Sequence, residues 1–289
     1  MASPPEEKIT FACQECGKSI TFPAYCAGHV EDCPECGRYV DVPRESESLP
    51  FQTEAEPPKG VAPAERTTLE LWFEVSAVLC LAYLPALYYT ICAVSLDRLP
   101  EYSPFHEALY RTILAAQIAM PLFAIIVLAK DRWSLFGIVR PRWVIDLLLA
   151  CVIWFCCRAF RRFALWMMPL WILRLPHPHG SALGMAPQGI FEYFLLFVAC
   201  AASGFEQELI YRGYLVPRFE RLLRSTWLAV LVAALLFGSY HLYEGVAATI
   251  IVTGIGIIYG IAFCLTRRFW PLCLAHTLHN FLLSTWLTH

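Results

Sequence analysis

The sequence predicts an all-α polytopic membrane protein that carries a small N-terminal head. Of the 289 residues, 58% are hydrophobic and only 16% are charged, whereas soluble globular domains average about 25% charged residues. The apolar residues also gather in runs of about 20, the length that a helix needs to cross a bilayer. Together these observations exclude a disordered, collagen-like or coiled-coil chain.

The apolar runs predict about seven transmembrane helices, or eight if residues 163–185 form another. Segment Phe163–Leu175 is rich in Trp and Met but too short to cross, so we expect it to lie at the membrane interface. Residues 1–68 contain no apolar stretch typical of a signal peptide, and we expect none. The predicted spans are approximately 69–95, 107–129, 143–162, 189–211, 225–241, 246–265 and 270–288.

Basic residues between the spans predict the orientation of the chain. The loops after the second, fourth and sixth spans are rich in Arg and Lys, as in the pair Arg267 and Arg268. The alternate loops, 96–106 and 242–245, carry one Arg between them. We therefore expect an integral protein of the plasma or inner membrane, with the N-terminal head cytoplasmic and the C-terminus outside.

Three arginines do not fit this orientation. Arg158, Arg161 and Arg162 would lie at the outer end of the third span. They could snorkel to the lipid headgroups. Alternatively, the third span could be a re-entrant pair of helices, and the sequence leaves both possibilities open.

Four cysteines in the head have the spacing of a zinc ribbon. Cys13 and Cys16 form one CxxC pair, and Cys33 and Cys36 form another after 16 intervening residues. Four thiolates suit a tetrahedral zinc ion, although two disulfides or free thiols are the alternative. We predict a zinc-ribbon-like domain over residues 8–44, in which a structural Zn²⁺ supplies folding energy that so small a core lacks.

Charge divides the chain into an acidic head and a mildly basic membrane domain. Residues 1–68 hold 6 Lys/Arg against 12 Asp/Glu, whereas residues 69–289 hold 16 against 12. An acidic head argues against nucleic acid as a partner and would suit a basic protein partner. Residues 45–68, rich in Glu, Pro and Ser, are expected to be a flexible linker to the membrane domain at 69–289.

The second half of the membrane domain carries polar residues inside its predicted spans. A charge in the bilayer costs roughly 2.5–3.5 kcal/mol on insertion scales, so such residues are functional candidates. Glu208 and Arg212 share a helix face and can pair, whereas Glu206 and Glu208 differ by about 200° around the helix. The candidate residues are Glu206, Glu208, Arg212, His241, His276 and Asn280.

These side chains are suited to hydrolysis of a peptide bond. A carboxylate can take a proton from water, and imidazole and amide groups can stabilise an oxyanion. Glu with two His could instead hold a divalent metal such as zinc, which lowers the pKa of bound water. A polar network that only joins helices, or a transport pathway, is the alternative.

At these residues the chain resembles the CAAX-processing and bacteriocin-immunity family of intramembrane proteases, the type II CAAX prenyl endopeptidases. The family pattern is EExxxR on one span, FxxxH on the next and HxxxN on a later one. The resemblance covers roughly residues 130–289, including the segment Phe136–Arg142. It implies a membrane-associated peptide or protein substrate, expected to be prenylated at a CAAX-type end. The matching positions are Glu208 and Arg212, Phe237 and His241, and His276 and Asn280.

The resemblance also implies a role for each matching residue. His241 would orient the attacking water or share its proton. Arg212 would hold Glu208, while His276 and Asn280 would stabilise the oxyanion. The family's first Glu, the implied general base, aligns with a different residue in this chain.

That residue is Gln207, which cannot take a proton. Three interpretations remain open. Glu208 serves as the base with help from His241, or Glu206 substitutes where the helix is distorted. Otherwise the protein is a non-catalytic relative, a membrane binding or immunity protein that binds without cleaving.

The predicted spans also pose a problem of depth. His241 would lie at the outer end of the fifth span, whereas Glu208 and His276 would lie nearer the inner side. A common site requires the fourth span to continue past Arg212, or residues 213–224 to run along the membrane.

Overall fold

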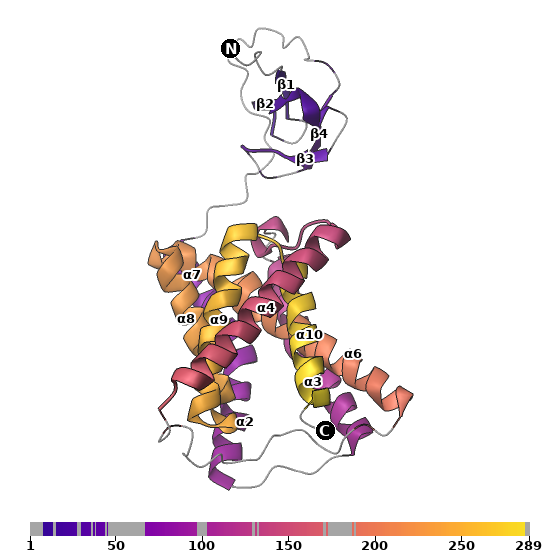
Figure 1. Ribbon diagram of the computed structural model, residues 1–289. Helices are drawn as coiled ribbons and strands as arrows, with labels where there is room; N and C mark the ends of the chain where they lie inside the picture. Colours follow the sequence, from indigo (N-terminus) through magenta and orange to yellow (C-terminus); the bar gives the residue numbers. More distant parts are fainter. Residues whose placement is uncertain are drawn as a thin grey trace. The chain divides into compact units, whose positions relative to one another are not determined.

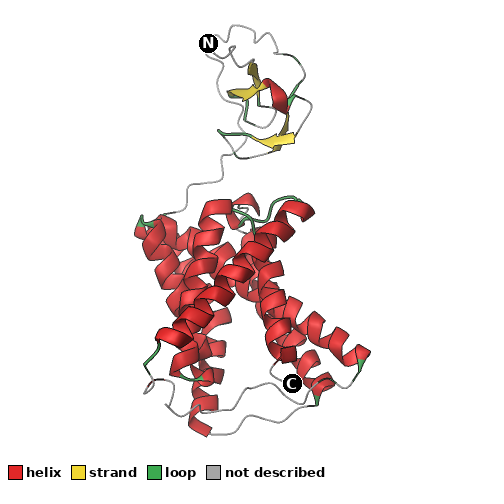
Figure 2. Cartoon of the chain, in the orientation of Figure 1, coloured by secondary structure: helices red, strands yellow, loops and turns green. Residues whose placement is uncertain are grey.

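The computed structural model comprises two units, residues 1–62 and 63–289, and each is described by itself. Strands occur in the first unit, and the described residues of the second are helical or in loops and turns (Figure 2). The structure describes residues 8–13, 16–27, 30–35, 37, 39–43, 45, 67–96, 103–128, 131, 133–169, 172, 187 and 189–286.

The head consists of two antiparallel β-hairpins. Alternating residues of the first hairpin, such as Phe11 and Ile20, are buried, and these two are paired across the strands. Val40 and Val42 complete the same small core from the second hairpin. The elements are β1 (Lys8–Ala12), β2 (Ser19–Pro23), a 3₁₀ turn (Ala24–Cys26), β3 (Val30–Asp32) and β4 (Tyr39–Asp41).

The second unit, residues 63–289, is the membrane unit. Its helices confirm the predicted all-α polytopic class (Figure 1). Six helical runs of the described chain are long and apolar enough to cross a membrane, and α10 is a shorter apolar helix of 17 residues. The elements are α1 (Thr68–Val78), η2 (Leu79–Tyr83), α2 (Leu84–Leu96), α3 (Pro104–Leu128), η3 (Trp133–Phe136), α4 (Trp143–Met167), α6 (Ile190–Glu208), η4 (Leu209–Leu215), α7 (Val216–Leu223), α8 (Thr226–Tyr240), η5 (His241–Glu244), α9 (Val246–Thr266) and α10 (Trp270–Trp286).

The run formed by α6, η4 and α7 is the central helix of this unit. Half of its apolar window is buried, compared with a third or less in the other five spans. It continues to Leu223, well beyond the predicted end at residue 211, because a π-helical segment carries the backbone through Gly213 and Pro217 occupies the first turn of α7. Residues 213–223 therefore continue the same helical run and do not form a separate helix.

Helix α4 is one continuous helix, which excludes the re-entrant pair. It continues through Met167, so the first residues of the expected interfacial segment, 163–167, belong to it. Their apolar side chains and lack of Gly or Pro allow the helix to continue. Most of the rest of that segment, and of the possible eighth span, lies outside the described residues. Figure 1 shows α4 crossing obliquely over α9 and α10, both of which it contacts.

The loop between α3 and α4 packs against the turn between α9 and α10. Gly137 accepts a hydrogen bond from the backbone N–H of Phe269, at 2.8 Å. Its φ of +71° lies in the left-handed region that favours glycine. A Cβ at this position would lie only 2.6 Å from the ring of Phe263 and 3.2 Å from the carbonyl oxygen of Arg267. The loop conformation and the close packing therefore both require glycine.

Buried ion pairs fasten the ends of several helices to one another. Arg218 of α7 is fully buried, donates to Glu74 of α1 at 2.8 Å and pairs with Asp131 of the α3–α4 loop. Arg268, before α10, donates to Asp146 of α4 at 2.7 and 3.0 Å. Because each pair joins elements far apart in sequence, these charges hold the loops onto the helical bundle.

Candidate functional site

Helix lengths bring Glu208 and His241 to the same depth in the membrane unit. Glu208 lies 15 residues before the end of α7 at Leu223, and His241 lies 15 residues after the start of α8 at Thr226. The two helices form a tight hairpin and pack against each other. At a rise of about 1.5 Å per residue, both side chains lie roughly 22 Å from the turn. The continuation of the central helix thus removes the difference in depth that the predicted spans implied.

Glu208 is fully buried and binds two other candidate residues. Its Oε1 accepts a hydrogen bond from Arg212 Nη1 at 3.0 Å and one from His276 Nδ1 at 2.7 Å. Arg212 is itself 1% exposed and also donates to the carbonyl oxygen of Gly256 on α9, at 3.2 Å. Glu208 Oε2 is buried and has no hydrogen-bond partner within the described part of the chain. One carboxylate oxygen is therefore held in place while the other remains available.

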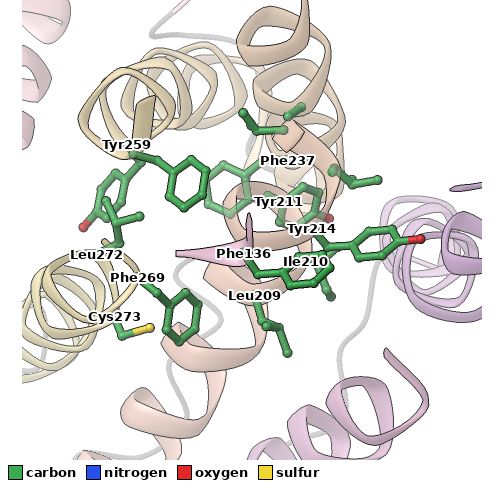
Figure 3. Packing of buried hydrophobic residues seen from close by; sticks show 14 of the residues in the cluster. Phe136, Leu209, Ile210, Tyr211, Tyr214, Phe237, Tyr259, Phe269, Leu272 and Cys273 are labelled. Carbon is green, nitrogen blue, oxygen red and sulfur yellow. The ribbon is translucent and has the colours of Figure 1, made fainter. Parts of the chain in front are cut away.

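The ring of Phe237 lies among these charged and imidazole groups. Its centroid is 4.4 Å from the Arg212 guanidinium carbon, a cation–π contact. It is also 5.1 Å from the ring of His241 and 6.1 Å from that of His276. Tyr259 of the next helix, also labelled in Figure 3, lies 5.2 Å from the same guanidinium carbon. Phe237 thus connects the two histidines, which belong to helices separated in sequence.

His241 has one ring nitrogen bonded and the other unpaired. Its Nδ1 lies 2.8 Å from Glu244 Oε1 in the short 3₁₀ turn that follows α8. Its Nε2 is buried without a hydrogen-bond partner among the described residues. A carboxylate can only accept, so Nδ1 donates, and Nε2 carries the free lone pair when the ring is neutral.

The residues beside Glu208 point to different partners. Gln207 donates from Nε2 to Ser203 Oγ at 3.1 Å, and its buried Oε1 has no partner in the described chain. Glu206 is 8% exposed and lies on the straight α-helical part of the run, because the π-helical distortion begins only after Glu208. It makes none of the contacts that Glu208 makes with Arg212 and His276.

Asn280 lies one turn beyond His276 on α10, and its side chain is half-buried. The i,i+4 spacing places both on one face of α10. Within that helix, the neighbouring His279 has a buried Nδ1 with no partner among the described residues. The structure therefore places Arg212, His241 and His276 around the ring of Phe237, with Glu208 bonded to Arg212 and His276. Asn280 follows one helical turn after His276.

Helix α9 contributes residues to the site that the sequence did not predict. Tyr259 lies 5.2 Å from the Arg212 guanidinium carbon and 5.6 Å from the His276 ring. Gly256 supplies the carbonyl that binds Arg212, and a Cβ there would lie 3.2 Å from Phe237. The glycines of the predicted sixth span were the available signal, because small residues let helices approach closely.

The membrane site and the head differ in their capacity to bind a metal. Across the described residues, the group of three or more His, Cys, Asp or Glu side chains with converging ligand atoms lies in the head. Glu208, His241 and His276 form no such group among the described residues. The head cysteines are therefore the metal-binding candidates whose ligand atoms the described structure brings together.

Three head cysteines, Cys13, Cys16 and Cys33, could bind a metal ion. Their sulfur atoms all lie within 4.8 Å of one another, and Cys16 Sγ is 3.9 Å from Cys33 Sγ. That separation is too long for a disulfide, whose S–S bond is about 2.05 Å. It matches the edge of a tetrahedron whose metal–sulfur bonds are about 2.3 Å. The fourth predicted ligand, Cys36, lies outside the described residues.

Backbone turns at the tips of the two hairpins position these cysteines. The N–H of Gly17 donates to the carbonyl of Cys13 at 2.8 Å, and the N–H of Gly37 donates to that of Cys33 at 2.7 Å. Both glycines have positive φ, +71° and +66°. The fifth head cysteine, Cys26, is different, because burial raises the pKa of its thiol and disfavours the thiolate form that binds metals.

An exposed ion pair links the two cysteine turns. Lys18 Nζ lies 2.7 Å from Glu35 Oε2. This hydrogen bond raises the pKa of the Lys18 ammonium group above its ordinary value. The pair is solvated and contributes little stability. The stability of the folded head is therefore expected to depend on the cysteines.

These features define an all-α polytopic membrane protein whose long central helix buries a carboxylate in contact with arginine and histidine. Residues 189–282 match the family model described as Type II CAAX prenyl endopeptidase Rce1-like. The match runs from the start of α6 into α10 and includes all the candidate residues of the membrane site. It is shorter than the expected resemblance over 130–289 and leaves out the loop around Gly137. The curated proteins and the solved structures compared with the chain gave no significant match.

Proposed function

We propose that the membrane unit is an intramembrane endopeptidase that hydrolyses a membrane-associated peptide. The observation that carries this proposal is the environment of Glu208. Its Oε1 is fixed by Arg212 and His276, while its buried Oε2 has no partner in the described chain. The family match supports proteolysis, and its description suggests a substrate with a prenylated CAAX-type end.

In this mechanism Glu208 and His241 activate the water. Water adds to the peptide carbonyl carbon, and its proton passes to Glu208 Oε2 or His241 Nε2. The same group returns the proton to the leaving amine nitrogen as the carbon–nitrogen bond breaks. Arg212 supplies the positive charge that compensates Glu208 in the dry interior. In this glutamate-type mechanism, the proton transfers do not require a bound metal ion.

His276 and Asn280 are proposed to stabilise the tetrahedral oxyanion. His276 donates from Nδ1 to Glu208, so a doubly protonated ring would present Nε2–H to the substrate oxygen. Asn280 adds an amide donor one turn away. Glu206 stays a lower-ranked candidate for the base, since it does not share the contacts of Glu208.

A second candidate function is a membrane binding or immunity protein that does not cleave. Gln207 favours it, because it takes the place of the implied catalytic carboxylate and donates to Ser203. In this case the buried polar residues would bind a peptide or lipid without proton transfer. The two functions make opposite predictions for the wild type, which cleaves peptides only under the first.

For the head we propose a structural zinc ion bound by Cys13, Cys16, Cys33 and Cys36 in a zinc-ribbon-like domain. The close approach of the three described sulfur atoms supports this. We further propose that the acidic head lies in the cytoplasm and binds a basic protein partner, with the C-terminus on the outer side. Labelling of tags at both ends with a membrane-impermeant reagent tests the orientation, and equal labelling of both would contradict it.

The test of the enzymatic function compares the termini of membrane proteins in cells carrying variants of the full chain. The wild type is expected to produce new peptide ends that are absent with His241→Ala, His276→Ala and Glu208→Gln. Ends that appear only with Gln207→Glu would indicate a site inactivated by that residue. If all variants insert and fold yet none produces new ends, the binding function replaces the enzymatic one.

A further inference from the structure

We propose that Glu244 is a positioning residue of the site, which holds His241 as a second proton acceptor and so compensates for Gln207. The inference rests on the proposed proteolytic function and extends it to a residue outside the three motifs. It concerns the least explained feature of the site, namely how water is activated when an amide stands at the position of the expected base.

The hydrogen bond between Glu244 and His241 determines what His241 can do. The carboxylate accepts from Nδ1–H at 2.8 Å. A neutral ring then has its lone pair on Nε2, the atom that is buried and unpaired among the described residues. A carboxylate that accepts from one ring nitrogen fixes the tautomer of a histidine and leaves the opposite nitrogen as the acceptor.

The local backbone explains why these two residues meet. Helix α8 ends at Tyr240 and the chain continues as a 3₁₀ turn over His241–Glu244. A 3₁₀ helix has three residues per turn, so side chains at i and i+3 are aligned. In an α-helix the same spacing would leave them about 60° apart. Gly245, with φ of +97°, then ends the turn and starts α9.

His241 faces the same centre as Glu208. Its ring is 5.1 Å from Phe237, whose ring also contacts Arg212 and His276, the two partners of Glu208. Glu208 Oε2 and His241 Nε2 thus both offer the site an acceptor atom that has no partner among the described residues. This pair can replace the pair of carboxylates that the family pattern places on one helix.

The surroundings of Glu244 compensate its charge from other helices. Arg161 of α4 and Arg111 of α3 both lie within electrostatic reach of its carboxylate. Arg161 is half-buried, so its charge acts inside the unit as well as toward the headgroups. Arg161 is one of the three arginines that did not fit the predicted orientation, and this electrostatic interaction gives it an opposite charge within the protein.

The first experiment measures cleavage of an internally quenched, farnesylated CAAX-type peptide by the full chain. Glu244→Ala is expected to lower kcat/KM roughly 10- to 100-fold, and Glu244→Asp to retain part of the activity. Glu220→Ala is the matched control, because it removes a carboxylate that pairs with Arg267 instead, and it is expected to leave kcat/KM unchanged.

The same experiment in a Gln207→Glu background tests the compensation. In that background, the loss of kcat/KM caused by Glu244→Ala should be at least about tenfold smaller than in the wild type, because a second carboxylate is present. An unchanged kcat/KM for Glu244→Ala, or the same loss in both backgrounds, would overturn the inference and leave the proteolytic function standing.

A second measurement does not depend on cleavage. The ¹⁵N shifts of the His241 ring, assigned by difference from His241→Ala, should show a protonated Nδ1 in the wild type and a shift toward protonated Nε2 in Glu244→Ala. The same tautomer in both proteins would overturn the inference. If the tautomer shifts as expected but the wild type cleaves no peptide, the result supports the positioning of His241 by Glu244 and contradicts the proteolytic function.

Discussion

At the scale of single residues, the candidate site in the membrane unit is organised around a buried ion pair. Glu208 and Arg212 are almost completely buried and lie 3.0 Å apart. The guanidinium also contacts Phe237 and Tyr259, and His276 binds the same carboxylate oxygen. Taking two charges out of water is costly, so such a pair is stable only when both members are present and hydrogen-bonded.

The pair predicts a strong coupling between substitutions at its two positions. Arg212→Met should lower the free energy of unfolding by about 3–5 kcal/mol, because it leaves an uncompensated buried carboxylate. Adding Glu208→Gln removes that charge, so the double variant should be more stable than Arg212→Met alone. Thermal unfolding of the purified full chain measures both, and losses that simply add would contradict the coupling.

At the scale of elements, the packing of loops and helices depends on close backbone approach. The α3–α4 loop contacts the α9–α10 turn through Gly137. Within the bundle, α8 and α9 approach where a Cβ on Gly260 would lie 2.7 Å from Val230. These contacts set the position of α9, which supplies Tyr259 and Gly256 to the site.

Replacement of Gly137 should therefore destabilise the membrane unit. Gly137→Ala adds a Cβ at positive φ and against Phe263, which should cost about 1–3 kcal/mol. Gly189→Ala is the control, since a Cβ there meets nothing within 4 Å, and its effect should stay within about 0.5 kcal/mol. Thermal unfolding in detergent distinguishes the two, and equal effects would argue against the packing explanation.

At the scale of the whole molecule, the chain joins two units that are stabilised by different means. The membrane unit buries a large helical core with internal ion pairs. The head has a small core formed by two short hairpins, and Cys13, Cys16 and Cys33 gather at the hairpin tips. A domain of this size usually needs a metal or disulfides to fold.

Metal analysis of the purified full chain should accordingly find about one zinc ion per chain. Cys13→Ser, Cys16→Ser and Cys33→Ser should each lose it, whereas Cys26→Ser should retain it. Removal of the metal with a chelator should unfold the head and leave the melting of the membrane unit unchanged. Zinc that persists in Cys13→Ser and disappears with His241→Ala would place the metal in the membrane unit and contradict this assignment.

The sequence by itself determined the features that depend on local spacing and hydrophobicity. Apolar runs near the length of a bilayer span predicted the polytopic class, which the structure confirms. A spacing of four residues placed Glu208 and Arg212 on a common helix face, and the structure shows their contact. Such patterns are readable because neighbours three or four residues apart meet in any helix.

The tertiary structure decided which of these faces meet. Glu208 and His276 are 68 residues apart, and their hydrogen bond depends on how α6 and α10 pack. The extension of the central helix through a π-helical segment, which sets the depth of Glu208, is likewise not visible in the hydrophobic pattern. Residues of α9 enter the site only because glycines allow its backbone to approach. Contacts between distant segments reflect the packing of the whole chain, which local sequence patterns do not specify.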